Sequence, residues 1–304
     1  MWRALAGLSL AGAVASTVGA TGMASYLARR ITSRPRTHRP AHFSFTPWEV
    51  GLAHENVEIP VEDAFLSGWF IPQEDESAPV ILGLSGHGGT KSDLLGISAR
   101  LHADGFSVLL FDFRGAGQSP GSIRTLGHNE TLDARAALDW LASRVTGPIG
   151  ILGYSLGGSI ALMLAASDPR ISAVVSDSGF AAQREILAHH VRRKTGLWPG
   201  PVLSIAGPML SRRHGKTYDD FAPLAIADQI SPRPLLLIHS KDDQIVPFQH
   251  ALDIWERARE PKEAWFPEEA GHCGAYFQDR PGYCQRITGF FNASLKAGIS
   301  VESS

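Results

Sequence analysis

Cysteine is scarce in this chain, and so is net charge. Two cysteines among 304 residues, Cys273 and Cys284, are too few for a disulfide-stapled fold and do not have zinc-ligand spacing. A formal net charge of −2 gives no electrostatic reason to expect nucleic acid as a partner. No fixed-period repeat is visible, which argues against a solenoid. With 44% apolar residues, the chain can instead bury a sizeable core.

Motifs for metals and nucleotides are also missing. No HExxH pattern and no paired carboxylate–histidine ligand set occurs, so a metal is not implied. The stretch GHGGTKS only faintly resembles a phosphate loop, because the required Gly-Lys-Ser reads Thr90-Lys91-Ser92 here. We therefore expect no metal and no other cofactor.

The N-terminus differs in composition from the rest of the chain. Residues 4–28 contain no charged side chain, and a helix of that length would reach roughly 37 Å, enough to cross a bilayer. The stretch is rich in Ala, Gly, Ser and Thr, so its hydrophobicity is modest. A secretory signal cleaved after the small residues Val18-Gly19-Ala20 and a soluble helix are the alternatives. We assign residues 1–28 to a membrane anchor or signal segment.

A basic, proline-containing linker over residues 29–50 follows this segment. Five arginines lie in it: Arg29, Arg30, Arg34, Arg36 and Arg39. Because loops rich in Arg tend to stay cytoplasmic, an anchored chain is predicted to hold its main domain in the cytoplasm, near anionic lipid head groups. A cleaved signal would export that domain instead.

Short apolar strands alternate with amphipathic helical stretches over residues 51–299. Runs such as PVILGLS, FSVLLFDF and PIGILGYS are almost continuously apolar, which is typical of strands buried on both faces. Stretches such as NETLDARAALDWLASR have helical apolar spacing and polar starts. The alternation predicts one α/β domain with a mostly parallel sheet and helices on both of its faces.

A lone serine stands at the end of one predicted strand. Strand PIGILGY ends at Tyr154 and a helix begins at Ser155, so the serine occupies a tight strand-to-helix turn. Gly153 and Gly157 lack a Cβ and let the helix pack closely on the strand, which exposes the hydroxyl. Backbone N–H groups at the start of the helix face the same point and can stabilise an oxyanion. The context predicts a nucleophile.

A serine nucleophile needs a base, and the base needs a carboxylate that orients it. His272 lies in the glycine-flanked loop EEAGHCGAY before the last helix, and Asp242 and Asp243 follow the strand PLLLIHS. About thirty residues separate this pair from the histidine, which is the connection a parallel sheet requires. Asp177, at the end of another strand, is an alternative acid.

These motifs resemble those of the α/β-hydrolase superfamily. The likeness covers nearly all of residues 51–297 and includes GYSLGG, SGHGG, DFRGAGQS, SKDDQIVP and AGHC. It is closest to the serine-aminopeptidase-like and monoacylglycerol-lipase-like branch, which includes membrane-tethered bacterial hydrolases related to protein depalmitoylases. In that family the acid lies four residues before a proline, so the resemblance implies Asp243 rather than Asp242. Because charges in loops often pair locally, we expect Asp112 and Arg114 to order the turn after the fourth strand, and contact with substrate is the alternative.

The resemblance further implies an oxyanion hole made by two backbone N–H groups. They are the N–H of Leu156, directly after the serine, and that of His87 in the loop after the third strand. The family usually has His-Gly at the first two places of this loop, whereas this chain has Ser85-Gly86. The donors are backbone groups, so we expect the departure to alter loop detail and not the donor.

Substrate selection is expected from an insertion over residues 180–230, after the sixth strand. Its stretch LWPGPVLSIAGPML is apolar and includes the candidate substrate-binding residues Trp198, Leu203 and Met209. A small helical lid over an acyl pocket has this pattern, and so does a helix pair that packs on the sheet edge.

The sequence therefore predicts a serine hydrolase that cleaves carboxylic esters or thioesters through an acyl-enzyme intermediate. Small acyl esters, lipids and acylated proteins are the expected substrates, with the membrane contacted through the N-terminal segment. A serine peptidase with the same triad is one alternative. A catalytically silent hydrolase-fold binding protein is the other.

Overall fold

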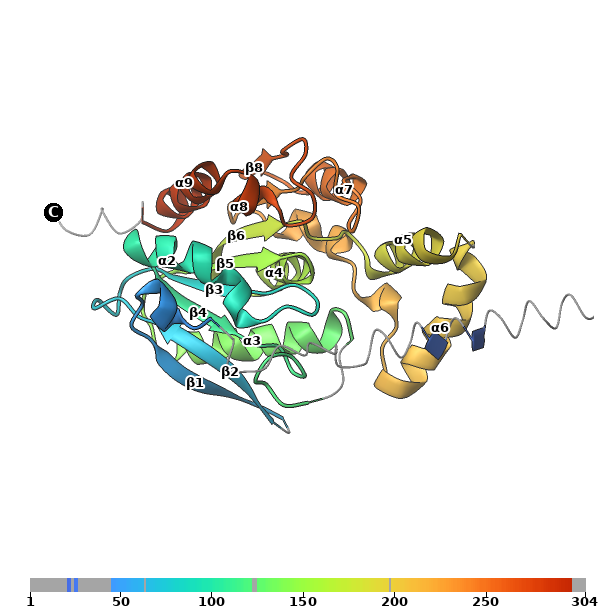
Figure 1. Ribbon diagram of the computed structural model, residues 1–304, viewed down its shortest axis with the longest axis horizontal. Coiled ribbons are helices and arrows are strands. Elements are labelled where there is room, and N and C mark those ends of the chain that lie inside the picture. The colour runs from blue at the N-terminus through green and yellow to red at the C-terminus, as the bar shows by residue number, and fades with distance from the viewer. Residues whose placement is uncertain are drawn as a thin grey trace, which may run out of the picture.

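An eight-stranded sheet forms the centre of the molecule (Figure 1). The computed structural model describes residues 21–22, 25–26, 45–62, 64–121, 125–196 and 198–296. The strands are β1 (Glu55–Val61), β2 (Ala64–Ile71), β3 (Val80–Leu84), β4 (Ser107–Phe111), β5 (Ile149–Tyr154), β6 (Ile171–Asp177), β7 (Leu235–Ile238) and β8 (Lys262–Trp265). Their spatial order is β1-β2-β4-β3-β5-β6-β7-β8.

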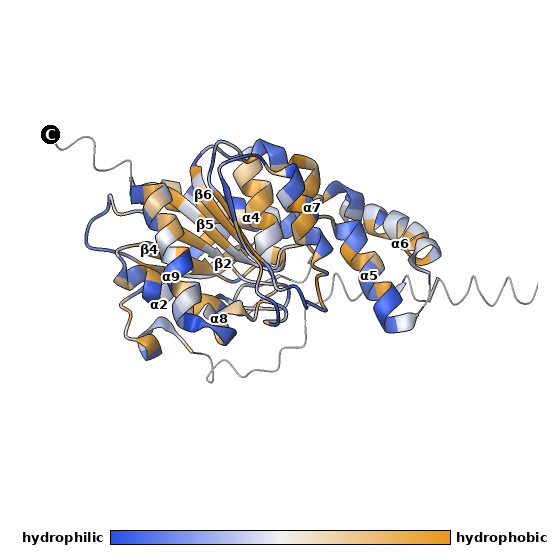
Figure 2. Cartoon of the chain, turned by 90° about the horizontal axis from the view of Figure 1, so that it is seen from above, coloured by the Kyte–Doolittle hydropathy of each residue, from blue (hydrophilic) through white to orange (hydrophobic). Residues whose placement is uncertain are grey.

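Only the first part of the sheet is antiparallel. Strand β2 pairs antiparallel with β1 and β4, and every pairing from β4 through to β8 is parallel. All residues of β3, β4 and β7 are buried, in agreement with their continuous apolar sequences. Hydrophobic residues accordingly dominate the central strands in Figure 2. The predicted α/β class with a mostly parallel sheet is confirmed.

Helices cover both faces of this sheet. Helices α2 (Leu95–Ala103) and α9 (Arg280–Phe291) contribute to the core on one face. On the other face lie α3 (His128–Ala142), α4 (Leu156–Ser167) and α7 (Gln249–Arg257). Shorter elements are η2 (Pro47–Val50), η3 (Lys91–Leu94), η4 (Tyr218–Asp220), η5 (Pro223–Gln229), α8 (Ala275–Gln278) and η6 (Asn292–Lys296).

The predicted insertion after β6 is helical. Helices α5 (Gln183–Thr195) and α6 (Pro199–His214) form a pair, called here the helical insertion, that projects from one end of the molecule in Figures 1 and 2. Apolar residues of the pair and Tyr218 of η4 form a small cluster, made of Leu187, Val191, Val202, Leu203, Ala206, Leu210 and Tyr218. Ile186 of α5 belongs to the main core, so the pair is also packed against the body of the molecule.

The predicted membrane anchor requires correction. Among the residues that the structure describes, no helix is both long and apolar enough to cross a bilayer. This finding contradicts the predicted transmembrane helix, the membrane-anchored localisation and membrane contact through the N-terminal segment. Most of that segment, residues 1–20, 23–24 and 27–28, lies outside the described residues. The length of the uncharged stretch suggested a span, but its Ala, Gly, Ser and Thr content carries little hydrophobicity.

Candidate active site

Ser155 lies in a sharp turn between β5 and α4, as the sequence predicted. Its backbone has φ 52° and ψ −115°, a left-handed conformation that is costly for a residue with a Cβ. The two flanking glycines make the turn possible. A Cβ at Gly153 would lie 2.1 Å from the Gly157 carbonyl oxygen, and one at Gly157 would lie 2.3 Å from the Leu84 carbonyl oxygen. Helix α4 can therefore start immediately after the strand.

The structure brings Ser155, His272 and Asp243 together from three separate loops. His272 Nε2 lies 2.9 Å from Ser155 Oγ, and His272 Nδ1 lies 2.6 Å from Asp243 Oδ2. The Asp243 side chain is fully buried, whereas that of His272 is 21% exposed. The three side chains thus form one hydrogen-bonded series that runs from the buried carboxylate through a partly exposed imidazole to the serine hydroxyl. Such a series is the arrangement in which histidine can accept the serine proton.

Asp243 is held as a carboxylate by its surroundings. Burial opposes its charge, but the hydrogen bond and charge of His272 and two backbone N–H groups lower its pKa below the ordinary value. Those N–H groups belong to Ile245 and Val246, at 2.8 and 2.9 Å from Asp243 Oδ1. Because Oδ1 is occupied by the backbone, Oδ2 is left to orient His272.

The two other candidate acids have different partners. Asp242 is exposed, and its Oδ1 accepts hydrogen bonds from Ser240 Oγ at 2.5 Å and from the Gly271 N–H at 2.8 Å. It therefore caps the loop that carries the histidine. Asp177 is buried, and its two carboxylate oxygens accept hydrogen bonds from Ser178 Oγ and Tyr283 Oη. The geometry therefore favours Asp243 as the partner of His272, in agreement with the family resemblance.

The predicted oxyanion-hole loop contacts the serine turn. A Cβ at Gly86 would lie 3.3 Å from Ser155 Cβ, so the backbone beside His87 passes directly over the nucleophile. Leu156 is the first residue of α4, and its side chain is buried. The roles of the His87 and Leu156 N–H groups in holding an oxyanion stay predictions. Ser85, in the same loop, has a buried hydroxyl without a hydrogen-bond partner among the described residues.

A buried ion pair fixes the far end of this loop. Lys91 Nζ donates to Asp112 Oδ2 at 2.8 Å, and both side chains are almost completely buried. Arg114, in the next turn, donates to the Asp133 carboxylate in α3 through its Nε and its backbone N–H. Asp112 and Arg114 thus pair locally and order the loops around the site, as we expected from their charges.

The three candidate substrate-binding residues lie in different surroundings. Leu203 is buried in the core of the helical insertion, and Met209 packs against that core. Trp198 stands between α5 and α6 with 72% of its surface exposed. The structure does not bring the three together, and their contact with a substrate stays a prediction.

Helix α5 approaches the serine site through polar residues that the sequence analysis did not single out. Arg193 Nη1 donates to the Gln244 carbonyl oxygen, next to Asp243, and His189 Nε2 lies 3.4 Å from the same oxygen. Burial, followed by the neighbouring positive charges, lowers the pKa of His190 to about 4. These two contacts join the helical insertion to the loop that carries Asp243. The sequence carries no signal for them, because polar residues on an amphipathic helix usually face solvent.

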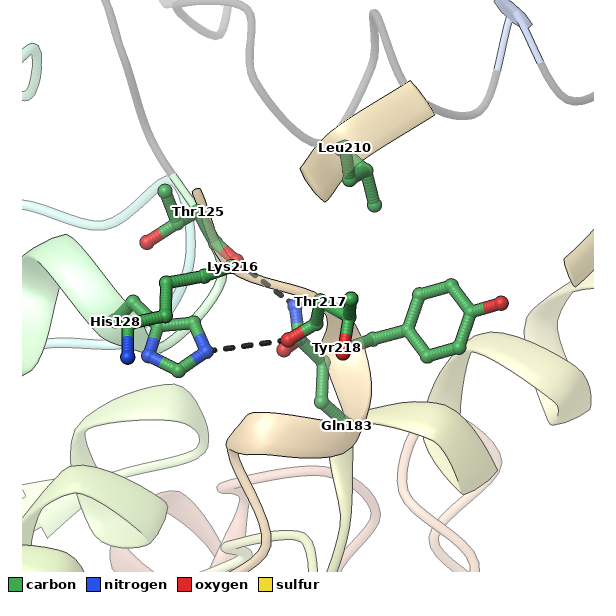
Figure 3. Close-up of a pocket in the computed structure, with 7 residues that line it drawn as sticks. All are labelled: Thr125, His128, Gln183, Leu210, Lys216, Thr217 and Tyr218. Atoms are coloured by element: carbon green, nitrogen blue, oxygen red, sulfur yellow. Dashed lines mark hydrogen bonds between the residues drawn. The ribbon is translucent and has the colours of Figure 1, made fainter. Parts of the chain in front are cut away.

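A small cavity lies where the helical insertion meets the start of α3, and none of the residues that line it belongs to the serine turn (Figure 3). Its volume is about 10 Å³, and it is lined by Thr125, His128, Gln183, Leu210, Lys216, Thr217 and Tyr218. Gln183 Nε2 donates to the Thr125 carbonyl oxygen at 2.8 Å across this cavity. A space of this size holds about one water molecule, so it is not an acyl pocket.

Comparison with known proteins agrees with this fold. The model of the X-Pro dipeptidyl-peptidase family S15 matches residues 68–214. YfhR of Escherichia coli K12 is 30% identical over 262 residues, which cover 82% of this chain and 83% of YfhR. The lysophosphatidylserine lipase ABHD12 of Xenopus tropicalis is 28% identical over 62% of this chain and 49% of its own length. The Pyrococcus furiosus esterase Pf2001 superimposes with a TM-score of 0.70 and 24% identity, over 87% of this chain and 98% of the esterase.

The mostly parallel sheet, the serine at its strand-to-helix turn and the relatives above together identify the protein superfamily. The chain belongs to the α/β-hydrolase superfamily. Within it, the chain is similar to YfhR over most of both sequences. The predicted superfamily is confirmed, and the relatives support a hydrolase, whereas the predicted aminopeptidase-like and lipase-like branch stays a prediction.

Proposed function

We propose that this protein is a serine hydrolase that cleaves carboxylic esters or thioesters of acyl substrates. The observation that carries the proposal is the unbroken series of hydrogen bonds from Ser155 Oγ through His272 to Asp243, at 2.9 and 2.6 Å. A nucleophile, a base and an orienting carboxylate within hydrogen-bonding distance are the parts that acyl transfer requires.

In the first half-reaction His272 Nε2 takes the proton from Ser155 Oγ as the oxygen attacks the acyl carbonyl. The Leu156 and His87 N–H groups receive the negative charge that develops on the carbonyl oxygen. Asp243 holds the Nδ1 proton, which leaves Nε2 free to accept, and stabilises the imidazolium that forms. His272 then gives the proton to the leaving alcohol or thiol, and an acyl-serine remains.

In the second half-reaction water takes the place of the alcohol or thiol. His272 removes a proton from the water, the resulting oxygen attacks the acyl-serine, and the proton returns to Ser155 Oγ as the carboxylic acid leaves. The ABHD12 relative is a lipase by name, which supports an acyl-lipid among the substrates. Esters, lipids and acylated proteins share the acyl group on which this chemistry acts.

A serine peptidase is the second candidate. The match of residues 68–214 to the model of the X-Pro dipeptidyl-peptidases favours it. The same three side chains would serve amide cleavage, and a peptidase additionally requires a site for the charged terminus of a peptide. Activity against dipeptide amides with no activity against acyl esters would favour this candidate.

Two measurements test the proposal. A fluorophosphonate probe should label the wild-type protein and should not label Ser155→Ala, since the probe reacts with an activated serine. A panel of p-nitrophenyl esters and acyl thioesters of increasing chain length, with an X-Pro dipeptide amide as control, should show turnover of the acyl substrates. Labelling that persists in Ser155→Ala would refute the nucleophile, and exclusive turnover of the amide would refute the substrate class.

A further inference from the structure

A second hydrogen-bonded series, which the proposed chemistry does not use, lies behind the three reacting side chains. Tyr283 Oη and Ser178 Oγ donate to the two oxygens of Asp177, at 2.9 and 2.8 Å. The backbone N–H of Cys273 donates to Ser178 Oγ at 3.1 Å. All three side chains in this series, those of Tyr283, Asp177 and Ser178, are at most 1% exposed.

This series is attached to the candidate site at two points, next to His272 and at Ser155. Cys273 directly follows His272, so its N–H belongs to the peptide bond that joins the two residues. At the other end, the carbonyl oxygen of Asp177 accepts the N–H of Ser155 at 2.7 Å. Asp177 therefore connects the serine turn to the histidine loop through its own backbone and through the hydroxyl of Ser178.

The backbone at these points is in a conformation that needs support. Ser155, Ser178 and Cys273 have φ values of 52°, 58° and 52°, three of the four left-handed residues other than glycine among the residues described. Such conformations persist only where surrounding contacts hold them. Because these three residues are joined by one series of hydrogen bonds, loss of one bond should let the His272 loop relax.

The Ser178 hydroxyl is oriented by Asp177. A hydroxyl has one proton to donate, and here that proton is directed at a buried carboxylate oxygen. The lone pairs of Ser178 Oγ are then free to accept the Cys273 N–H. Tyr283 occupies the second carboxylate oxygen, which stops Asp177 from rotating toward other donors.

We propose that Asp177 and Ser178 are positioning residues that hold the His272 loop at the distance from Ser155 required for proton transfer. The proposal rests on the proposed serine-hydrolase function. Neither residue touches the reacting atoms, and their effect is transmitted through the Cys273 N–H and the Ser155 N–H. Displacement of a reacting group by about 1 Å lowers catalysis by roughly 100-fold, so a modest relaxation of this loop is measurable.

The test removes the Ser178 hydroxyl without imposing new strain. Ser178→Gly suits a φ of 58° and deletes the acceptor of the Cys273 N–H. Ser178→Ala deletes the same acceptor and is measured in parallel, so that the result does not depend on one variant. Ser98→Ala is the matched control, because its hydroxyl is equally buried, at 1% exposed, and bonds only to the Leu94 carbonyl oxygen of the neighbouring turn.

The expected result is a kcat about 10- to 100-fold lower in both Ser178 variants, with KM within about twofold of wild type. The low-field proton resonance of the His272–Asp243 hydrogen bond should broaden and exchange faster with water in these variants. Ser98→Ala should keep the wild-type kcat and the wild-type resonance.

A kcat within twofold of wild type together with an unchanged resonance would overturn the positioning role. An equal loss of kcat in Ser98→Ala would also overturn it, since the effect would then be a general one on stability. The resonance is measured without substrate. It therefore still tests the positioning of His272 if the wild-type protein cleaves no ester and the proposed function fails.

Discussion

Replacement of Asp243 by asparagine removes one negative charge from a carboxylate with three donors. The backbone N–H groups of Ile245 and Val246 occupy Oδ1, at 2.8 and 2.9 Å. In Asp243→Asn these two donors select the amide oxygen for that place, which directs the amide NH₂ at His272 Nδ1. The imidazole then must carry its proton on Nε2, the atom that has to accept the proton of Ser155.

The wrong tautomer removes the base while the geometry persists. We therefore expect kcat to fall about 10⁴-fold, the scale known for an asparagine at this place in other serine hydrolases. That loss corresponds to roughly 5 kcal/mol of transition-state stabilisation. Stopped-time assays with a p-nitrophenyl ester, over a range of substrate concentrations, separate kcat from KM. KM should change little, because Asp243 is buried behind His272 and does not reach the substrate.

Asp242→Asn is the matched control for this change. It removes the same charge one residue away, but its side-chain oxygen can still accept the Gly271 N–H. We expect its kcat to stay within about threefold of wild type, because exposed charges of this kind contribute little. An Asp243→Asn variant with more than a tenth of wild-type kcat would refute the assignment of the acid, and so would a larger loss in Asp242→Asn.

Three further predictions concern stability. Ser85→Ala should stabilise the fold by about 1 kcal/mol, because it removes a buried hydroxyl without a partner, and a thermal midpoint below that of wild type would contradict this account. Lys91→Met should lower the free energy of unfolding by about 3–5 kcal/mol, since Asp112 is left as a buried, unpaired charge, and urea titration measures it. Burial raises the pKa of Asp177 to about 6, so the folded protein keeps this proton above the pH at which the unfolded chain loses it. Between pH 4 and pH 7 the free energy of unfolding of wild type should therefore fall by up to about 3 kcal/mol relative to that of Asp177→Asn. Parallel stability curves of the two proteins would contradict this sign.

The fold and the grouping of Ser155, His272 and Asp243 could be predicted because their signals are local. Continuous apolar runs mark buried parallel strands, and the turn at Ser155 needs glycines within two residues on either side. Asp243 and His272 each follow a strand of the same sheet, and the carboxyl ends of parallel strands meet at one edge. The order of these residues along the chain and the topology of a parallel sheet are then enough to predict that the three side chains meet.

The surroundings of the site depend instead on pairs that are distant in sequence. Cys273 and Ser178 are 95 positions apart, and Tyr283 and Asp177 are 106 apart. No periodicity connects such residues, because each contact results from the final packing of helices and loops. The approach of α5 to Gln244 is of the same kind, with Arg193 lying 51 positions before its partner.

The choice between Asp177 and Asp243 shows where the limit lies. Asp177 is the last residue of β6 and Asp243 lies in the loop after β7, so both carboxylates come from the carboxyl ends of neighbouring buried strands. What separates them is the set of donors around each carboxylate: Asp243 has one oxygen directed at an imidazole, whereas both oxygens of Asp177 are taken by hydroxyl groups. One of those hydroxyls belongs to Tyr283 on the last helix, whose place is decided by packing. The donors around each carboxylate therefore decide what it can orient, and two aspartates at neighbouring strand ends have different surroundings in one fold.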